Sequence, residues 1–257
     1  MAIDAAATGQ PAAKQPLLYK RLEPIEPSRH RGLKLDRMGR NYRFVANESV
    51  IPLAMSEFVL AGVYYPIVFS DGPEPMPLAV LGYRPGENLF VDADGQWTAG
   101  VYVPWYVRCY PFAMLNGPQD SLVPCVDVEG AGVGPLVGEL LLENDQPTEM
   151  LHEIMRFCHG YNRALKDTRE LGQLLRASGL LAAHEATIGL GGDRKPARLT
   201  GFHAVDGKKF QELPDKTFLA WRKKGLLTAV YQHLHSLSCW PVLSAAATAK
   251  LEKAAAA

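Results

Sequence analysis

The side chains best suited to recognise a ligand occur in the stretch VYVPWYVRCYPF at positions 101–112. Apolar and polar residues alternate along it, which predicts a strand whose successive side chains point to opposite faces. One face is typical of a core and carries Val101, Val103, Trp105, Val107 and Cys109. The other face carries three phenols and a guanidinium, on Tyr102, Tyr106, Tyr110 and Arg108.

This tyrosine and arginine face has two interpretations. It can form a pocket in which the phenols are flat walls and Arg108 binds a carboxylate through paired donors. Alternatively, a helix over residues 148–166 covers the face, and the phenols form hydrogen bonds at its rim. Pro104 interrupts a strand ladder, so the strand would be bulged or at an edge, where a peptide strand could approach.

The preceding hairpin supplies further candidates for the same wall. Strands are predicted at 77–83 and 88–92, joined by the turn RPGE, and a DADG turn follows before Trp97. We therefore add Arg84, Asp92 and Trp97 to the candidate ligand-binding residues, although Trp97 is equally suited to cover a hairpin.

The histidines are the second chemical candidate. Read as a strand, residues 226–237 place His233 and His235 on one face, from which two imidazoles could reach one metal ion. His203 could supply a third ligand. The alternative is that these rings form hydrogen bonds on a half-exposed strand, and this alternative is favoured.

Familiar catalytic motifs do not occur in the sequence. It contains no GxSxG, no GxxxxGK[ST] and no HExxH, and neither GAGVG nor GLGG matches a dinucleotide-binding loop. We therefore expect no cofactor and favour a non-enzymatic protein.

The composition limits which classes of partner and which cellular location are expected. The 257 residues include 27 basic and 27 acidic side chains, so the formal net charge is zero. A nucleic-acid binder would carry an excess of positive charge, so peptides, proteins or small molecules are the expected partners. Four widely spaced cysteines and the absence of a signal-like start predict a cytoplasmic location. The oligomeric state is left open.

The segment VIPLAMSEFVLAGVYYPIVF at 50–69 is long and apolar enough to suggest a membrane span. Pro52 and Pro66 would break the helix, and a carboxylate at Glu57 costs roughly 2.5 to 3.5 kcal/mol inside a bilayer. We instead expect a short helix from Ser56 to about Val63, followed by a buried strand.

The order of elements predicts one α+β domain with a mostly antiparallel sheet, one long central helix and a short C-terminal helix. An apolar stripe at intervals of 3 and 4 residues predicts the long helix after Pro147, and Gly179 ends it. We expect a flexible lead-in at 1–40, the domain at 41–243, and a disordered or helical alanine-rich tail at 244–257.

These segments resemble the bacterial SapC family. The resemblance is carried, in order, by the segment at 50–69, PLAVLGYRPGENLFVDADGQW, YVPWYVRCYPF, QPTEMLHEIMRFC, LTGFHAVDGKKFQEL and YQHLHSL, over roughly residues 40 to 240. The family is named after a gene in a surface-layer protein locus, so the resemblance implies a soluble accessory protein linked to export or assembly of that layer. It brings no catalytic residue with it.

Two functional hypotheses follow. The first is an accessory protein that binds a peptide, a protein partner or a small aromatic or carboxylated ligand. The second is a metal-dependent enzyme that uses His233 and His235, with His203.

Overall fold

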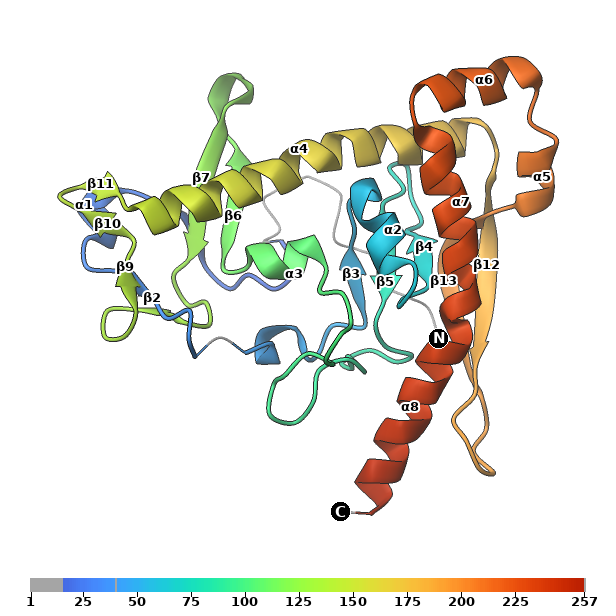
Figure 1. Ribbon diagram of the computed structural model, residues 1–257, viewed down its shortest axis with the longest axis horizontal. Coiled ribbons are helices and arrows are strands. Elements are labelled where there is room, and N and C mark those ends of the chain that lie inside the picture. Colours follow the sequence, from blue (N-terminus) through green and yellow to red (C-terminus); the bar gives the residue numbers. More distant parts are fainter. Residues whose placement is uncertain (1–15, 40, 257) are drawn as a thin grey trace.

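A five-stranded antiparallel sheet forms the larger of two cores (Figure 1). The structure, a computed structural model, describes residues 16–39 and 41–256. In sheet order the strands are β12 (Leu181–Ile188), β13 (Ala197–Val205), β4 (Ile67–Phe69), β5 (Pro77–Val80) and β3 (Val50–Pro52). Strands β4 and β5 are short apolar runs buried along their whole length, which is typical of strands covered on both faces.

Smaller sheets build the other end of the molecule. A three-stranded sheet has the order β1 (Leu22–Pro24), β7 (Leu122–Asp127) and β6 (Phe112–Asn116). Another has the order β8 (Val133–Gly134), β2 (Lys34–Leu35) and β9 (Glu139–Leu140), and a hairpin pairs β10 (Leu142–Glu143) with β11 (Gln146–Pro147). The strand pairs are antiparallel, and together with the helices they confirm the predicted α+β class.

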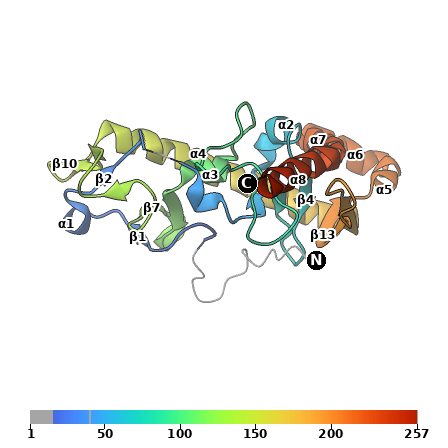
Figure 2. The same ribbon diagram turned by 90° about the horizontal axis from the view of Figure 1, so that it is seen from below.

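The long helix α4 (Glu149–Ala177) joins the two ends, as Figures 1 and 2 show. Thr148 caps its first turn by accepting a hydrogen bond from the backbone of Leu151, and Gly179 follows its end with a φ of 69°. Leu171 and Leu175 pack in the larger core, whereas Cys158 packs in the smaller one. The predicted long helix is thereby confirmed as a single element that belongs to both cores.

Shorter helices complete the fold. They are α1 (Pro27–His30), α2 (Phe58–Ala61), α3 (Trp105–Cys109), α5 (Gly207–Gln211), α6 (Asp215–Lys223), α7 (Leu226–Ser236) and α8 (Trp240–Ala255). Single 3-10 turns occupy Arg43–Val45, Met55–Glu57, Pro118–Asp120 and Leu237–Cys239. Helix α7 packs on β4 and β13, and α8 packs on β12 (Figure 1).

The prediction of a strand at 226–237 is wrong, because this segment is helix α7. Gly225 adopts a left-handed conformation directly before it, and the buried positions recur at helical rather than alternating intervals. Those positions are Leu226, Ala229, Val230, His233 and Ser236. The alternation within YQHLH covers too few residues to oppose the longer helical period around it.

The prediction of a strand at 101–112 is also wrong. Residues 101–104 have no regular structure, α3 follows Pro104, and β6 begins only at Phe112. Proline fixes its own φ and lacks an N–H, so it suits the start of a helix and disrupts a ladder. Of the strand predicted at 88–92, only Val91 forms a bridge, to Trp97.

Residues 50–69 form β3, a 3-10 turn, α2 and β4, close to the expected short helix and buried strand. Among the described residues, no helix combines the length and apolar character that a membrane crossing requires. The expected lead-in at 1–40 contains β1, α1 and β2 in its described part, and its first fifteen residues and residue 40 lie outside the described residues. In the expected alanine-rich tail, helix α8 continues to Ala255.

Candidate functional site

Helix α3 brings one side chain of the predicted face, Arg108, to the surface. The helix is only five residues long, and Val107 and Cys109 on either side of Arg108 are buried. In a helix, neighbouring residues diverge by about 100° rather than alternating. The tyrosines at 102, 106 and 110 therefore do not form one wall with Arg108.

A buried carboxylate positions the start of α3. Glu57 is 2 % exposed and accepts three hydrogen bonds, from the backbone of Ala54 at 2.8 Å, the backbone of Trp105 at 2.6 Å and the hydroxyl of Tyr102 at 2.9 Å. Burial raises the pKa of Glu57, and these hydrogen bonds and the nearby charge of Arg108 oppose that rise. Glu57 thus fixes both Tyr102 and the first turn of α3.

Arg108 lies over two aromatic rings at the surface. Its guanidinium carbon is 5.4 Å from the ring centre of Tyr102 and 5.1 Å from that of Phe157 on α4. Its Nη2 also donates to the Tyr102 hydroxyl at 3.2 Å. The result is an exposed cation held in a defined orientation by a phenol and by two ring faces.

Tyr106 and Tyr110 belong instead to the packing beneath the N-terminal segment. Tyr106 donates to the backbone carbonyl of Leu17. Tyr110 is 2 % exposed, stacks on Phe44 with ring centres 4.1 Å apart, and accepts a hydrogen bond from the backbone of Ala131 at 3.2 Å. These two tyrosines are thus covered, but chiefly by the N-terminal segment through Leu17 and Tyr19 and not by the long helix alone, which contacts Tyr106 through Tyr161.

The hairpin candidates also have structural contacts. Trp97 is buried and donates to the hydroxyl of Tyr65 at 3.2 Å, and Tyr65 in turn donates to the backbone carbonyl of Tyr102. Asp92 accepts a hydrogen bond from Gln96 within its own turn. Trp97 therefore does not face a ligand. It helps to position the backbone of Tyr102 through its hydrogen bond to Tyr65.

Arg84 has its own carboxylate partner. It forms two hydrogen bonds of 3.0 Å with Glu87, and its guanidinium carbon lies 5.3 Å from the ring centre of Tyr83. Glu87 is also 3.6 Å from the ammonium group of Lys250 on α8. Arg84 thus takes part in a surface ion-pair group that ties its loop to α8.

The histidine pair does not share a face, because α7 is a helix. His233 is fully buried, and its Nε2 accepts a hydrogen bond from the backbone of Val205 at 3.0 Å, while His235 is exposed. His203, on β13, lies 4.0 Å from a carboxylate oxygen of Asp71. In the described part of the chain, no group of three or more histidine, cysteine, aspartate or glutamate side chains is arranged to hold a metal ion.

Sequence reasoning missed Glu57 and Phe157 as parts of the site. From the sequence, Glu57 served only as an argument against a membrane span. A single carboxylate in a twenty-residue apolar stretch also indicates a buried, hydrogen-bonded group. A buried carboxylate requires donors around it. Phe157 gave no comparable signal, since its proximity to Arg108 depends on how α3 packs against α4.

The fold and the site together define an α+β protein with an oriented surface arginine and no recognised catalytic motif. The family model of SapC matches residues 25–243, and the chain therefore belongs to the SapC family. No curated protein and no protein of solved structure matches the chain.

Proposed function

We propose that this SapC-family chain is a non-enzymatic accessory protein that binds a carboxylate-bearing ligand at Arg108. The ligand class is a peptide, a protein partner or a small aromatic acid. One observation carries the proposal: an exposed guanidinium lies within 5.4 Å of the ring centres of both Tyr102 and Phe157. A planar guanidinium matches a carboxylate through paired hydrogen bonds, and the adjacent rings offer an apolar surface to an aromatic group.

The arrangement of Tyr102 favours binding because it limits motion at the site. Its hydroxyl donates to Glu57 and accepts from Arg108, so the phenol is fixed by both bonds. A binding surface that is already ordered loses less side-chain entropy when a ligand arrives. Glu57 acts here as a positioning residue beneath the site.

The biological setting rests on family membership alone. We propose that the chain serves export or assembly of a surface-layer protein, from a cytoplasmic location, because the SapC resemblance implies this role. In that setting the carboxylate at Arg108 belongs to a segment of the transported or assembled protein.

The proposal is tested by titrating the protein with N-acetylphenylalanine and, separately, with its uncharged amide, while following backbone amide resonances by NMR. We expect saturable shifts around Arg108 and Phe157 with the acid, and binding at least about tenfold weaker with the amide. Arg108→Gln should remove the difference between the two probes. Arg156→Gln is the matched control, because Arg156 is an exposed arginine that pairs with Glu149 on α4.

Equal binding of the acid and the amide, or acid binding unchanged in Arg108→Gln, would exclude the carboxylate site. Arg108→Lys provides a finer test, since lysine keeps the charge but loses the fork of donors. If Lys restores full affinity, charge alone is sufficient and paired recognition is rejected. Circular dichroism of each variant verifies that the fold is retained.

A further inference from the structure

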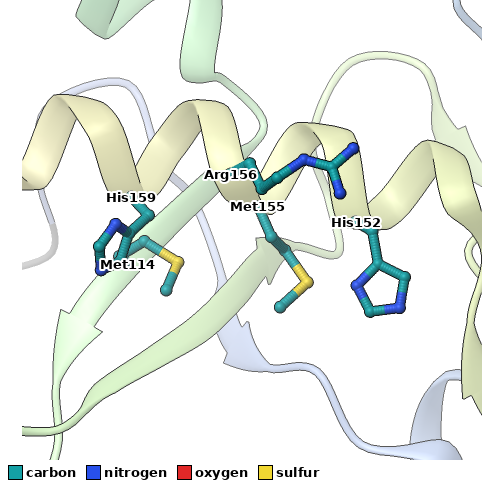
Figure 3. A pocket seen from close by; sticks show the side chains of 5 residues that line it. All are labelled: Met114, His152, Met155, Arg156 and His159. Atoms are coloured by element: carbon teal, nitrogen blue, oxygen red, sulfur yellow. The ribbon is translucent and has the colours of Figure 1, made fainter.

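A groove on another face of α4 collects sulfur and imidazole side chains. It has a volume of about 300 Å³ and is lined by Met114 on β6 and by His152, Met155, Arg156 and His159 on α4. Figure 3 shows the two thioethers and the two imidazole rings along the same side of the helix. None of these residues belongs to the candidate site at Arg108.

Helical spacing explains why these side chains meet. Met155 and His159 are four residues apart and His152 and Met155 are three apart, so Met155 neighbours both rings on one helix face, while the two rings are two turns apart. Met155 lies between the two rings along the helix axis (Figure 3). Any ion held by its sulfur would therefore have an imidazole within one helical turn on either side.

Strand β6 brings the second thioether to this face in a fixed position. Asn162 on α4 donates to the backbone carbonyl of Met114 at 2.8 Å, and the Cys158 thiol contacts the carbonyl of Phe112 at 3.9 Å. The two contacts anchor β6 against the helix on both sides of residue 113. Met114 is thereby held at the groove independently of any ligand.

We propose that this groove binds a soft monovalent cation, Cu(I), through the thioethers of Met114 and Met155 and the imidazole of His159, with His152 as an additional ligand. Thioether sulfur is a soft donor that selects Cu(I) over harder divalent ions, and imidazole also suits copper. Among the described residues, the lining offers no carboxylate, the donor that calcium and magnesium require. The imidazoles alone would also suit zinc, so it is the pair of thioethers that selects Cu(I).

The surrounding charges are compatible with a cation. Among the described residues that line the groove, Arg156 is the one arginine or lysine, and its guanidinium forms a hydrogen bond of 2.9 Å with Glu149. In Figure 3 it extends along the helix toward His152, whereas Met155 descends from the helix and Met114 lies below it beside His159. Its positive charge is thus partly compensated by Glu149, and it lies toward the His152 end of the groove rather than at the sulfur atoms.

Burial limits competition from the thiols packed near the groove. Cys109, Cys125 and Cys158 are buried. The hydrogen bond with Cys158 together with burial raises the pKa of the Cys109 thiol, and burial raises that of Cys125 to about 11. A thiol must lose its proton to become a strong metal ligand, and a raised pKa opposes that loss. Solvent-accessible ligation should therefore occur at the groove.

The experiment uses the reduced full chain with methyl-¹³C methionine. One equivalent of Ag(I), a soft monovalent stand-in for Cu(I), should shift the ε-methyl signals of Met114 and Met155 and leave that of Met38, which is 97 % exposed, unchanged. Competition with bicinchoninate under anaerobic conditions then measures Cu(I) affinity. We expect Met155→Leu and His159→Gln each to weaken it by about tenfold or more.

Met38→Leu and His235→Gln are the matched controls, since both residues are exposed and lie outside the groove. They should leave Cu(I) affinity unchanged. The proposal would be overturned if Ag(I) left the methyl signals of Met114 and Met155 unchanged. It would also be overturned if Met155→Leu and His159→Gln kept the Cu(I) affinity of the wild type. Either result would place the metal on the thiols or elsewhere. Loss of the methyl shifts in His159→Gln with unchanged circular dichroism would support it.

Discussion

The hydroxyl of Tyr102 donates to Oε1 of Glu57 at 2.9 Å, across 45 residues of sequence. The same oxygen accepts the backbone N–H of Trp105 at 2.6 Å, so one carboxylate oxygen fixes both Tyr102 and the first residue of α3. In this position the Tyr102 hydroxyl accepts a hydrogen bond from Arg108. The buried carboxylate therefore links the core to the proposed ligand surface.

Glu57→Gln should destabilise the protein by about 2 kcal/mol, because an amide nitrogen would replace one of two oxygens that face only donors. Urea denaturation measures the loss in the free energy of unfolding. Glu153→Gln, at an exposed position on α4, is the control and should change stability by less than about 0.5 kcal/mol. Equal stability of the two variants would show that the hydrogen bonds to Glu57 contribute little.

Stability should decrease in mild acid because of His233. Burial lowers the pKa of this imidazole to about 4 from an ordinary value of 6.5. The unfolded chain therefore binds the proton more readily, so the stabilisation is complete above about pH 6.5 and is lost as the pH falls toward about 4, by up to about 3 kcal/mol. Protonation would also prevent Nε2 from accepting the Val205 N–H.

Urea denaturation of the wild type and His233→Gln between about pH 7.5 and 4 measures this dependence. His184 also lies near enough to disfavour the charged form of His233, so the variant and the wild type are compared at each pH. His233→Gln should be less stable at neutral pH but lose less on acidification. Parallel curves for the two proteins would assign the acid sensitivity to other groups.

Gly172→Ala should destabilise the protein although alanine is the better helix former. A Cβ at Gly172 would overlap the backbone carbonyl oxygen of Pro75, so α4 and the loop before β5 would have to separate. Overpacking of this kind costs typically about 1 to 3 kcal/mol, which exceeds the gain of up to about 1 kcal/mol in helix propensity. Thermal unfolding should show a lower midpoint.

Gly189→Ala is the control for that variant, because a Cβ there would meet nothing within 4 Å. It should leave the midpoint unchanged or slightly raised, since alanine restricts the unfolded chain. A Gly172→Ala protein as stable as the Gly189→Ala protein would mean that the loop moves away without cost.

Much of the fold could be predicted from sequence patterns of sufficient length. The stripe along α4, the buried runs of β4 and β5, and the ends of α4 depend on local periodicity and on glycine and threonine conformations. The secondary structure of short segments was harder to predict. The five residues of α3 and the histidine-bearing α7 both contain alternating polar and apolar residues, and such alternation does not distinguish a strand from a helix over so short a length.

The sequence by itself determined the α+β class, the long helix and the SapC membership, because each depends on residue order and periodicity along the chain. Only the tertiary structure decided the site. Arg108 meets Phe157 on a different helix and Tyr102 meets Glu57 across 45 residues, and such contacts arise from the packing of α3 against α4 and of the 50–69 segment beneath it. Local sequence does not determine those distances, because they depend on how the residues of the two cores pack against helix α4.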